Sequence, residues 1–311
     1  MLAACSVVRR GISNPQVAAE LLTAVRRFFN KRCGFKSLKV GADSHSHAAS
    51  ASAPSSSSSS PSAFDEIKLE LCDRPSLTAL CRESGSFHFD RCPLGCTINS
   101  VQMQQWQHTS AGEVATPRSG LSLPPIAPSG SARHTTREHV PQRAAVKVTT
   151  TTTTTTQSDA TQRGEHTTLS KTYEVRGIAA LVGLPRLQLG AVLAHELCHA
   201  FMHLLRFPRL PPVVAEGVCE LWASLWLAAV ADGTEEQGQG AAEASARLLQ
   251  LRRNADPVYG DGLRQATACY EDFVQSRGVT GGGGAAAELL PEFMKLVREK
   301  RRWWKKAGPP S

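Results

Sequence analysis

The chain has 311 residues, of which 35 are Lys or Arg, 27 are Asp or Glu and only 6% are aromatic. The net charge of +8 comes from the two ends, because residues 1–40 and 295–306 together contribute +13 and leave −5 for the rest. An acidic body argues against a basic, nucleic-acid-binding face, so no nucleic acid partner is expected. Nine cysteines, an odd number without disulfide spacing, indicate a reducing compartment and hence a cytoplasmic protein.

The N-terminal segment 1–40 is basic, with Glu20 as its only acid. This composition is similar to that of an organellar transit peptide, which makes an organelle the alternative location. Between Asn14 and Asn30, however, apolar residues recur at helical spacing. That periodicity favours a helix that packs onto the domain.

Two segments without any aromatic residue, 41–63 and 109–172, interrupt the chain. The first is rich in Ser, and the second is rich in Ser, Thr and Pro and contains a threonine run at 149–156. Because such segments bury too little apolar surface to offset the entropy of ordering them, both are predicted to be disordered insertions. Residues 64–108, with a short strand predicted at 67–71, form the upstream part of the domain.

Residues 173–311 are dense in apolar residues and are predicted to form the catalytic core. Their most apolar stretches are interrupted by charged residues, so no transmembrane segment is expected. The fold class is therefore α+β and predominantly α-helical. Helices are predicted at 187–205, 212–231, 241–253, from the turn at 259–262 to 276, and at 288–306, where the basic end is a solvated helix end.

His195-Glu196-Leu197-Cys198-His199 is an HExxH motif within a helical, apolar segment. Residues four apart lie about 6 Å from each other along a helix, so the two imidazoles can converge on one Zn²⁺. Glu196 lies beside them and can act as the general base toward water. Burying these side chains without a metal would be costly, which favours zinc binding over a chance match.

The third ligand must come from elsewhere in the chain. His203 lies about 12 Å along the axis from His195, too far to share its metal, and is predicted to be a core or supporting histidine. Glu216 and Glu220 lie on one face of the following helix, so helical geometry leaves both open. Glu216 is preferred because Gly217 beside it would let this helix approach the HExxH helix, with Glu220 as a hydrogen-bonding support.

Four stretches of the sequence resemble a known family. They are Leu184-Pro185-Arg186, residues 193–200, Glu216-Gly217-Val218-Cys219 and residues 256–262. The family is that of the plant DA-one and DA-one-related proteins, which are ubiquitin-linked zinc metallopeptidases, and the resemblance runs from about Tyr173 to Phe273. It implies a gluzincin-like peptidase domain with His195, His199 and Glu216 as zinc ligands and Glu196 as the catalytic base. It also implies protein substrates, with ubiquitin-pathway and growth-regulatory proteins among them.

The chain departs from the family pattern in its regulatory modules. Family members carry ubiquitin-interacting helices and a LIM zinc module, and neither pattern is found in this sequence. The local Cys/His cluster has a C-x₃-C spacing at its end, whereas a LIM module needs paired C-x₂-C spacings. The cluster is therefore predicted to consist of ordinary thiols and a surface histidine. Its members are Cys81, His88, Cys92 and Cys96.

Tyr259 and Asp261 lie in a turn punctuated by glycines before a predicted helix. A structural role in the turn explains these residues, since Gly260 and Gly262 supply unusual dihedral angles and Asp261 can cap the helix. The catalytic alternative is that Tyr259 or Arg264 donates a hydrogen bond to the oxyanion of a tetrahedral intermediate.

The sequence thus predicts a zinc-dependent endopeptidase that cleaves proteins, with Zn²⁺ as its cofactor. The alternative is a non-catalytic scaffold or ubiquitin-associated binding protein that retains the peptidase fold. The intact His-Glu-His-Glu set favours the enzyme, whereas the missing regulatory modules favour the scaffold.

Overall fold

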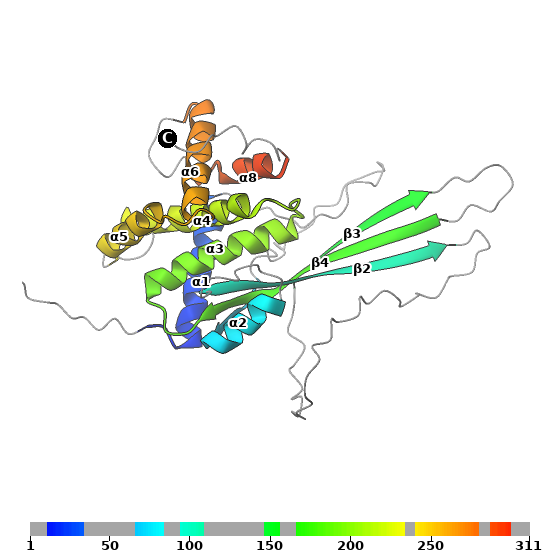
Figure 1. The fold of residues 1–311 in the computed structure, drawn as a ribbon, viewed down its shortest axis with the longest axis horizontal. Helices are drawn as coiled ribbons and strands as arrows, with labels where there is room; N and C mark the ends of the chain where they lie inside the picture. The colour runs from blue at the N-terminus through cyan, green and yellow to red at the C-terminus, as the bar shows by residue number, and fades with distance from the viewer. Residues whose placement is uncertain are drawn as a thin grey trace, which may run out of the picture.

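The structure is a computed structural model that describes residues 11–33, 66–83, 94–108, 146–155, 166–233, 240–279 and 287–299. It is a mostly helical α+β fold built on a small mixed sheet (Figure 1). The helices are α1 (Pro15–Arg32), α2 (Arg74–Glu83), α3 (Arg186–Leu204), α4 (Pro212–Ala231), α5 (Ala241–Arg252), α6 (Gly260–Ser276) and α8 (Leu290–Glu299). The strands are β1 (Leu69–Cys72), β2 (Gly95–His108), β3 (Val146–Thr155) and β4 (His166–Leu181).

Strand β4 is the centre of the sheet. Strand β2 runs antiparallel along one side of β4, and β3 pairs antiparallel with the first part of its other side. Strand β1 pairs in parallel with the last part of β4, with Leu69 opposite Ile178 and Cys72 opposite Leu181. The far ends of β2, β3 and β4 extend away from the helices, whereas the end formed with β1 lies among them (Figure 1).

Strand β3 and the start of β4 fall within 109–172, so the prediction of a disordered insertion is wrong for these residues. Threonine is β-branched and favours the extended backbone of a strand. Here the residues from Thr149 to Thr155 pair with β4. Strand pairing can order a segment that buries little apolar surface, and the prediction did not take it into account. The segment 41–63 lies outside the described residues, and the division of the chain into domains stays a prediction.

Helix positions agree with the periodicity of the sequence. Helix α1 begins after Asn14, whose side-chain oxygen accepts a hydrogen bond of 2.8 Å from the Gln16 amide, and Pro15 occupies its first turn. Helix α4 begins at Pro212, as predicted. Helix α2 was not predicted as a separate element. The basic residues 300–306 lie outside the described residues.

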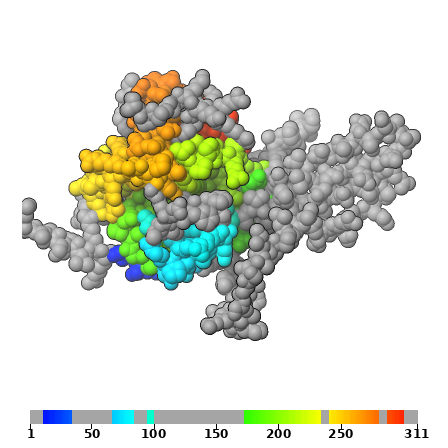
Figure 2. Space-filling view, in the orientation of Figure 1, coloured from blue at the N-terminus to red at the C-terminus, as the bar shows by residue number. Residues whose placement is uncertain are grey.

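The elements form layers, because alternate residues of β4 face opposite sides of the sheet. Ala179 joins a small core with Leu77 of α2, whereas Ile178 and Ala180 join the main core on the side of α3. Helix α3 packs against α4, and α4 packs against α5 and α6. The space-filling view shows α5 and α6 above α2 on one face of the molecule (Figure 2).

The main core is centred on Trp222 of α4. Its ring stacks on Phe29 of α1 with 4.4 Å between centroids and lies 5.4 Å from the ring of Phe201 of α3. This contact confirms that the N-terminal helix packs onto the domain. By length and composition α4 could cross a membrane. However, 67% of its apolar stretch is buried inside the protein, so α4 is a helix of the core.

Two glycines allow close approaches between helices. A Cβ atom on Gly190 of α3 would lie 2.1 Å from the Trp226 ring, so Gly190 leaves the space that this ring of α4 occupies. A Cβ atom on Gly217 of α4 would instead lie 2.3 Å from the carbonyl oxygen of Gly262 on α6. The stated reason for preferring Glu216 is therefore wrong, because Gly217 makes room for α6 and not for the HExxH helix.

Candidate metal centre

Helix α3 carries the HExxH residues at its buried middle. One helical turn separates His195 from His199, and their Nε2 atoms lie 3.2 Å apart. The His195 side chain is 11% exposed and that of His199 is 21% exposed, so both rings are largely withdrawn from water. Two imidazole nitrogens at this separation can both bind one divalent metal ion.

Helix α4 brings a carboxylate to the same point. The Oε2 atom of Glu216 lies 3.2 Å from His195 Nε2 and 3.4 Å from His199 Nε2. In a tetrahedral site with bonds of about 2.0–2.1 Å, neighbouring ligand atoms are about 3.3 Å apart. The three separations thus match the edges of a tetrahedral face, and this donor set fits a zinc ion.

Glu220 lies one helical turn further along α4, on the other side of the His195 ring. Its Oε1 atom is 3.3 Å from His195 Nδ1, the nitrogen that faces away from Glu216. A carboxylate at this nitrogen fixes the tautomer and orientation of a ligating imidazole. The structure therefore places Glu220 where the sequence predicts a supporting role, with Glu216 nearer the point shared by both histidines.

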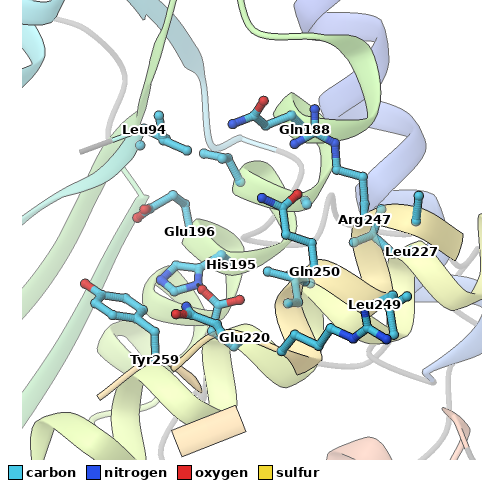
Figure 3. A pocket seen from close by; sticks show the side chains of 18 residues that line it. Leu94, Gln188, His195, Glu196, Glu220, Leu227, Arg247, Leu249, Gln250 and Tyr259 are labelled. Carbon is cyan, nitrogen blue, oxygen red and sulfur yellow. Dashed lines mark ion pairs between the residues drawn. The ribbon is translucent and has the colours of Figure 1, made fainter. Parts of the chain in front are cut away.

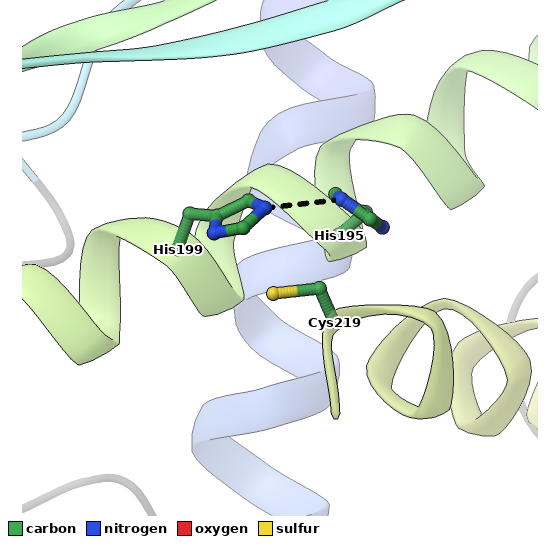
Figure 4. A group of neighbouring side chains, drawn as sticks. All are labelled: His195, His199 and Cys219. Atoms are coloured by element: carbon green, nitrogen blue, oxygen red, sulfur yellow. Dashed lines mark hydrogen bonds between the residues drawn. The ribbon is translucent and has the colours of Figure 1, made fainter. Parts of the chain in front are cut away.

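Cys219 is a further donor that sequence reasoning missed. Its sulfur and the nitrogens of His195 and His199 lie within 4.8 Å of one another (Figure 4). Burial, followed by the Cys198 thiol beside it, raises the pKa of Cys219. Glu216 Oε2 lies within 3.4 Å of the Nε2 atoms of both histidines. Cys219 follows Glu216 by three residues, a helical spacing that places both on one face of α4 and could have signalled this donor.

The charges of the site are coupled. Burial opposes protonation of His195, but the carboxylates of Glu216 and Glu220 outweigh burial and raise the pKa of the ring. For Glu216 burial alone would raise the pKa, and the two histidines outweigh it and lower the pKa of the carboxyl. Protons and a metal ion compete for these ring nitrogens, so metal affinity falls as the pH falls.

Glu196 lies next to the donor cluster and is held by the sheet. The Thr97 hydroxyl of β2 lies 2.9 Å from Glu196 Oε2 and 2.8 Å from the Glu196 carbonyl oxygen, and both residues are buried. A Cβ atom on Gly95 would lie 2.5 Å from Val192 Cγ1, which shows how closely β2 approaches α3. Nothing local in the sequence signals Thr97, because it precedes Glu196 by 99 residues.

Thr97→Val is expected to destabilise the protein by about 1.5–3 kcal/mol, because it removes a buried hydrogen bond to a carboxylate. The measurement is the free energy of unfolding in urea. Thr78→Val on α2 is the matched control, since the Thr78 hydroxyl donates only to the Arg74 carbonyl on an exposed face. The control should stay within about 0.5 kcal/mol of the parent. Equal losses in both variants would contradict the importance of the Thr97–Glu196 contact.

A cavity of about 770 Å³ opens beside the centre. His195, Glu196 and Tyr259 line one end of it (Figure 3). The Tyr259 ring stacks over the His195 ring with 6.4 Å between centroids. This position leaves the catalytic interpretation of Tyr259 open.

The turn before α6 is built differently from the prediction. Asp256 Oδ1 accepts hydrogen bonds of 2.8 Å from the amides of Val258 and Tyr259, whereas Asp261 lies inside the first turn of α6 and pairs with Arg264. Asp261 therefore does not cap the helix. Arg264 also donates a hydrogen bond of 2.8 Å to the Asn254 carbonyl. Arg264 is thereby engaged with the turn and does not line the cavity.

The other singled-out residues lie apart from the centre. His203 packs edge-to-face on Tyr173 of β4 with 5.6 Å between ring centroids. Cys81 and Cys96 are buried in the small core under α2, where Cys96 and then burial raise the pKa of the Cys81 thiol. His88 and Cys92 lie outside the described residues, so the interpretation of that cluster stays a prediction.

Part of this chain is similar to a known protein family. Residues 139–249 match the family described as DA1-like, Protein DA1. Protein DA1 of Arabidopsis thaliana is 36% identical over 115 residues, which cover 31% of this chain and 22% of that protein. The LIM domain-containing protein HDR3 of Oryza sativa subsp. japonica is 30% identical over 132 residues, which cover 34% of this chain and 26% of HDR3.

The similarity is thus distant and confined to part of each protein. Protein DA1-related 1 of Arabidopsis thaliana is 32% identical over 123 residues, or 32% of this chain and 22% of the relative. The chain therefore spans about a quarter or less of the length of these curated relatives. No solved structure matches it. The chain contains a DA1-like domain, and this domain carries His195, Glu196, His199 and Glu216.

Proposed function

We propose that the DA1-like domain of this chain is a zinc-dependent endopeptidase of the gluzincin type. The observation that carries the proposal is the triangle formed by His195 Nε2, His199 Nε2 and Glu216 Oε2, whose edges of 3.2, 3.2 and 3.4 Å suit tetrahedral zinc. These three residues would hold the ion. Zinc bound there supplies Lewis acidity and lowers the pKa of a bound water toward 7.

The remaining residues transfer protons or hold the reacting side chains in position. Glu196, at the wall of the cavity, accepts the proton of the attacking water and passes it to the leaving amine. Thr97 holds one oxygen of that carboxylate and leaves the other available. Glu220 accepts a hydrogen bond from His195 Nδ1 and so directs His195 Nε2 toward the position where the metal would bind. Tyr259 closes the cavity beside His195, and its hydroxyl is a candidate donor to the oxyanion.

The substrates proposed are proteins, and the family resemblance points to ubiquitin-pathway proteins among them. Similarity to DA1 supports this proposal only for the DA1-like domain of this chain. The match covers 22% of DA1 and of DA1-related 1, so it does not extend to the rest of those proteins. The cavity beside Glu196 supports it independently, since it is large enough to admit a side chain of a bound polypeptide.

Metal analysis tests the proposal. Elemental analysis of the purified full chain should find one zinc per molecule, and 1,10-phenanthroline should remove the zinc and abolish proteolysis of a denatured protein substrate. Dialysis at pH 5 should also release metal more readily than at pH 8, because protons compete for the histidines. A metal-free protein would refute the proposal, whereas bound zinc without any proteolysis would support the non-catalytic scaffold.

A further inference from the structure

Polar side chains follow one wall of the cavity. Arg247, Gln250 and Arg253 line it at intervals of three residues along α5 and its end, over about 9 Å of the helix axis (Figure 3). Gln188 lines the cavity from α3. We propose that these four residues, the polar wall, bind acidic side chains of the substrate at positions away from the bond that is cut. The inference rests on the proposed endopeptidase function and names a class of substrate for the same site.

The positive charges of the polar wall are available to a ligand. Arg253 is exposed, and no carboxylate in the described part of the chain pairs with it. The Arg247 side chain is 26% exposed, and its Nε atom lies 4.0 Å from Glu243 Oε1, at the outer limit of an ion pair. A guanidinium presents several N–H donors in one plane, which suits a carboxylate. The protein itself leaves most of this binding capacity unused.

The two glutamines add neutral donors to the polar wall. Each side-chain amide carries two N–H groups, and among the described residues neither Gln188 nor Gln250 has a side-chain hydrogen-bond partner. Asn254 also lines the cavity, but its side-chain oxygen accepts a hydrogen bond of 3.0 Å from the Asp256 amide and so belongs to the turn before α6. Donors outnumber acceptors at the polar wall, which favours an anionic ligand.

The end of the cavity at the metal centre has the opposite charge. Glu196 and Glu220 line it there, so an acidic side chain directly beside the scissile bond would face two carboxylates and be repelled. Gln188 precedes His195 by seven residues, or about 10 Å along α3. An extended chain covers that length in about three residues. We therefore expect the favoured acidic residue about two to four residues from the bond that is cut.

Apolar side chains also line the cavity, with Ala191, Val192, Ala223 and Leu227 among them. They do not distinguish acidic from neutral residues, because glutamine has nearly the shape of glutamate and makes the same apolar contacts. A comparison of Glu with Gln therefore isolates the charge. An exposed ion pair contributes a factor of up to about five, so two arginines set the expected preference for Glu at about five- to tenfold.

Matched peptides test the proposal. Each carries a single Glu, or Gln in its place, at successive positions on either side of the cleaved bond, and ends in a C-terminal amide. With the zinc-loaded full chain, kcat/KM should be about five- to tenfold higher for Glu than for Gln at a position beyond the first on one side. The preference should be largely lost in about 0.5 M NaCl, because salt screens charges that are exposed to solvent. A second set with free C-termini shows whether a terminal carboxylate is bound instead.

Two adjacent arginines provide the matched variants. Arg253 lines the cavity and Arg252 does not, although both are exposed and carry the same charge. Arg253→Gln should lower the Glu-to-Gln ratio of kcat/KM by about threefold or more, and Arg252→Gln should leave it as in the parent. Equal losses in the two variants would show an effect of net charge alone and would overturn the proposal.

The outcomes separate the polar wall from the proposed function. If no cleavage depends on Glu196, the endopeptidase fails, and the polar wall fails with it as a substrate site. Cleavage that depends on Glu196 but is equally fast for Glu and Gln peptides would overturn the polar wall alone. A preference for free C-termini without one for internal Glu would also overturn it, because the recognised carboxylate would then be that of the chain end.

Discussion

Glu196→Gln is expected to lower proteolysis by about 10²–10⁴-fold while the protein keeps its metal. The amide has the shape of the carboxylate but cannot accept the proton of the attacking water. It is not part of the donor triangle, so zinc content should be unchanged. Its carbonyl oxygen can still accept the Thr97 hydroxyl hydrogen bond, which preserves the packing of β2 against α3. The measurements are kcat/KM on a denatured protein substrate and the zinc content of the same sample.

The matched control for this prediction is Glu292→Gln on α8. Glu292 is 53% exposed, pairs with Arg277 and lies outside the cavity, so its replacement should leave kcat/KM unchanged. Cleavage by Glu196→Gln at the rate of the parent would show that the proteolysis comes from a contaminant or from a different base. Loss of zinc together with activity would show that Glu196 contributes to metal binding.

Replacing each of the two glutamates of α4 by alanine is expected to affect zinc binding to very different extents. Glu216→Ala should lose most of its zinc on dialysis against a weak chelator, because it removes the oxygen that lies within 3.4 Å of both Nε2 atoms. Glu220→Ala should retain zinc with an affinity lowered by about 10–100-fold, because it removes only the partner of His195 Nδ1. Zinc content of the two variants after identical dialysis measures the difference. A metal-free Glu220→Ala beside a zinc-loaded Glu216→Ala would reverse the assignment.

Cys219→Ala completes this series, because Cys219 is the other donor near both histidines. If Glu216 is the third ligand, Cys219→Ala should hold zinc as the parent does. Cobalt substitution gives an independent signal, since a thiolate ligand adds an intense charge-transfer band in the near ultraviolet. Such a band in the parent, absent from Cys219→Ala, would identify a His₂Cys site in place of His₂Glu.

The helical part of this protein could be predicted from the sequence because its signals are local. Periodic apolar residues, Pro212 at the start of α4 and Asn14 before α1 are each read within one or two turns of helix. The same locality placed both histidines on one face of α3. It could not choose between Glu216 and Glu220, because that choice depends on how α4 is rotated against α3.

The parts that were missed depend on contacts between distant segments. Thr97 reaches Glu196 across 99 residues, and the partner of the threonine strand is β4, which begins only at His166. Gly217 was correctly singled out as a point of close approach, but the sequence could not tell which helix approaches. Residue type indicates that a neighbour is near, whereas its identity follows only from the assembled fold.

That misassigned contact has a consequence for the centre. Gly217 directly follows Glu216, and Gly262 comes three residues after Tyr259, so the place where α4 touches α6 adjoins both a proposed ligand and the wall of the cavity. The backbone of α4 contacts the backbone of α6 there, and neither glycine has a side chain that could change its rotamer if one helix moved. A displacement of α6 must therefore be passed on to α4. This contact therefore ties the position of α6, which begins just after Tyr259, to that of α4, which carries Glu216.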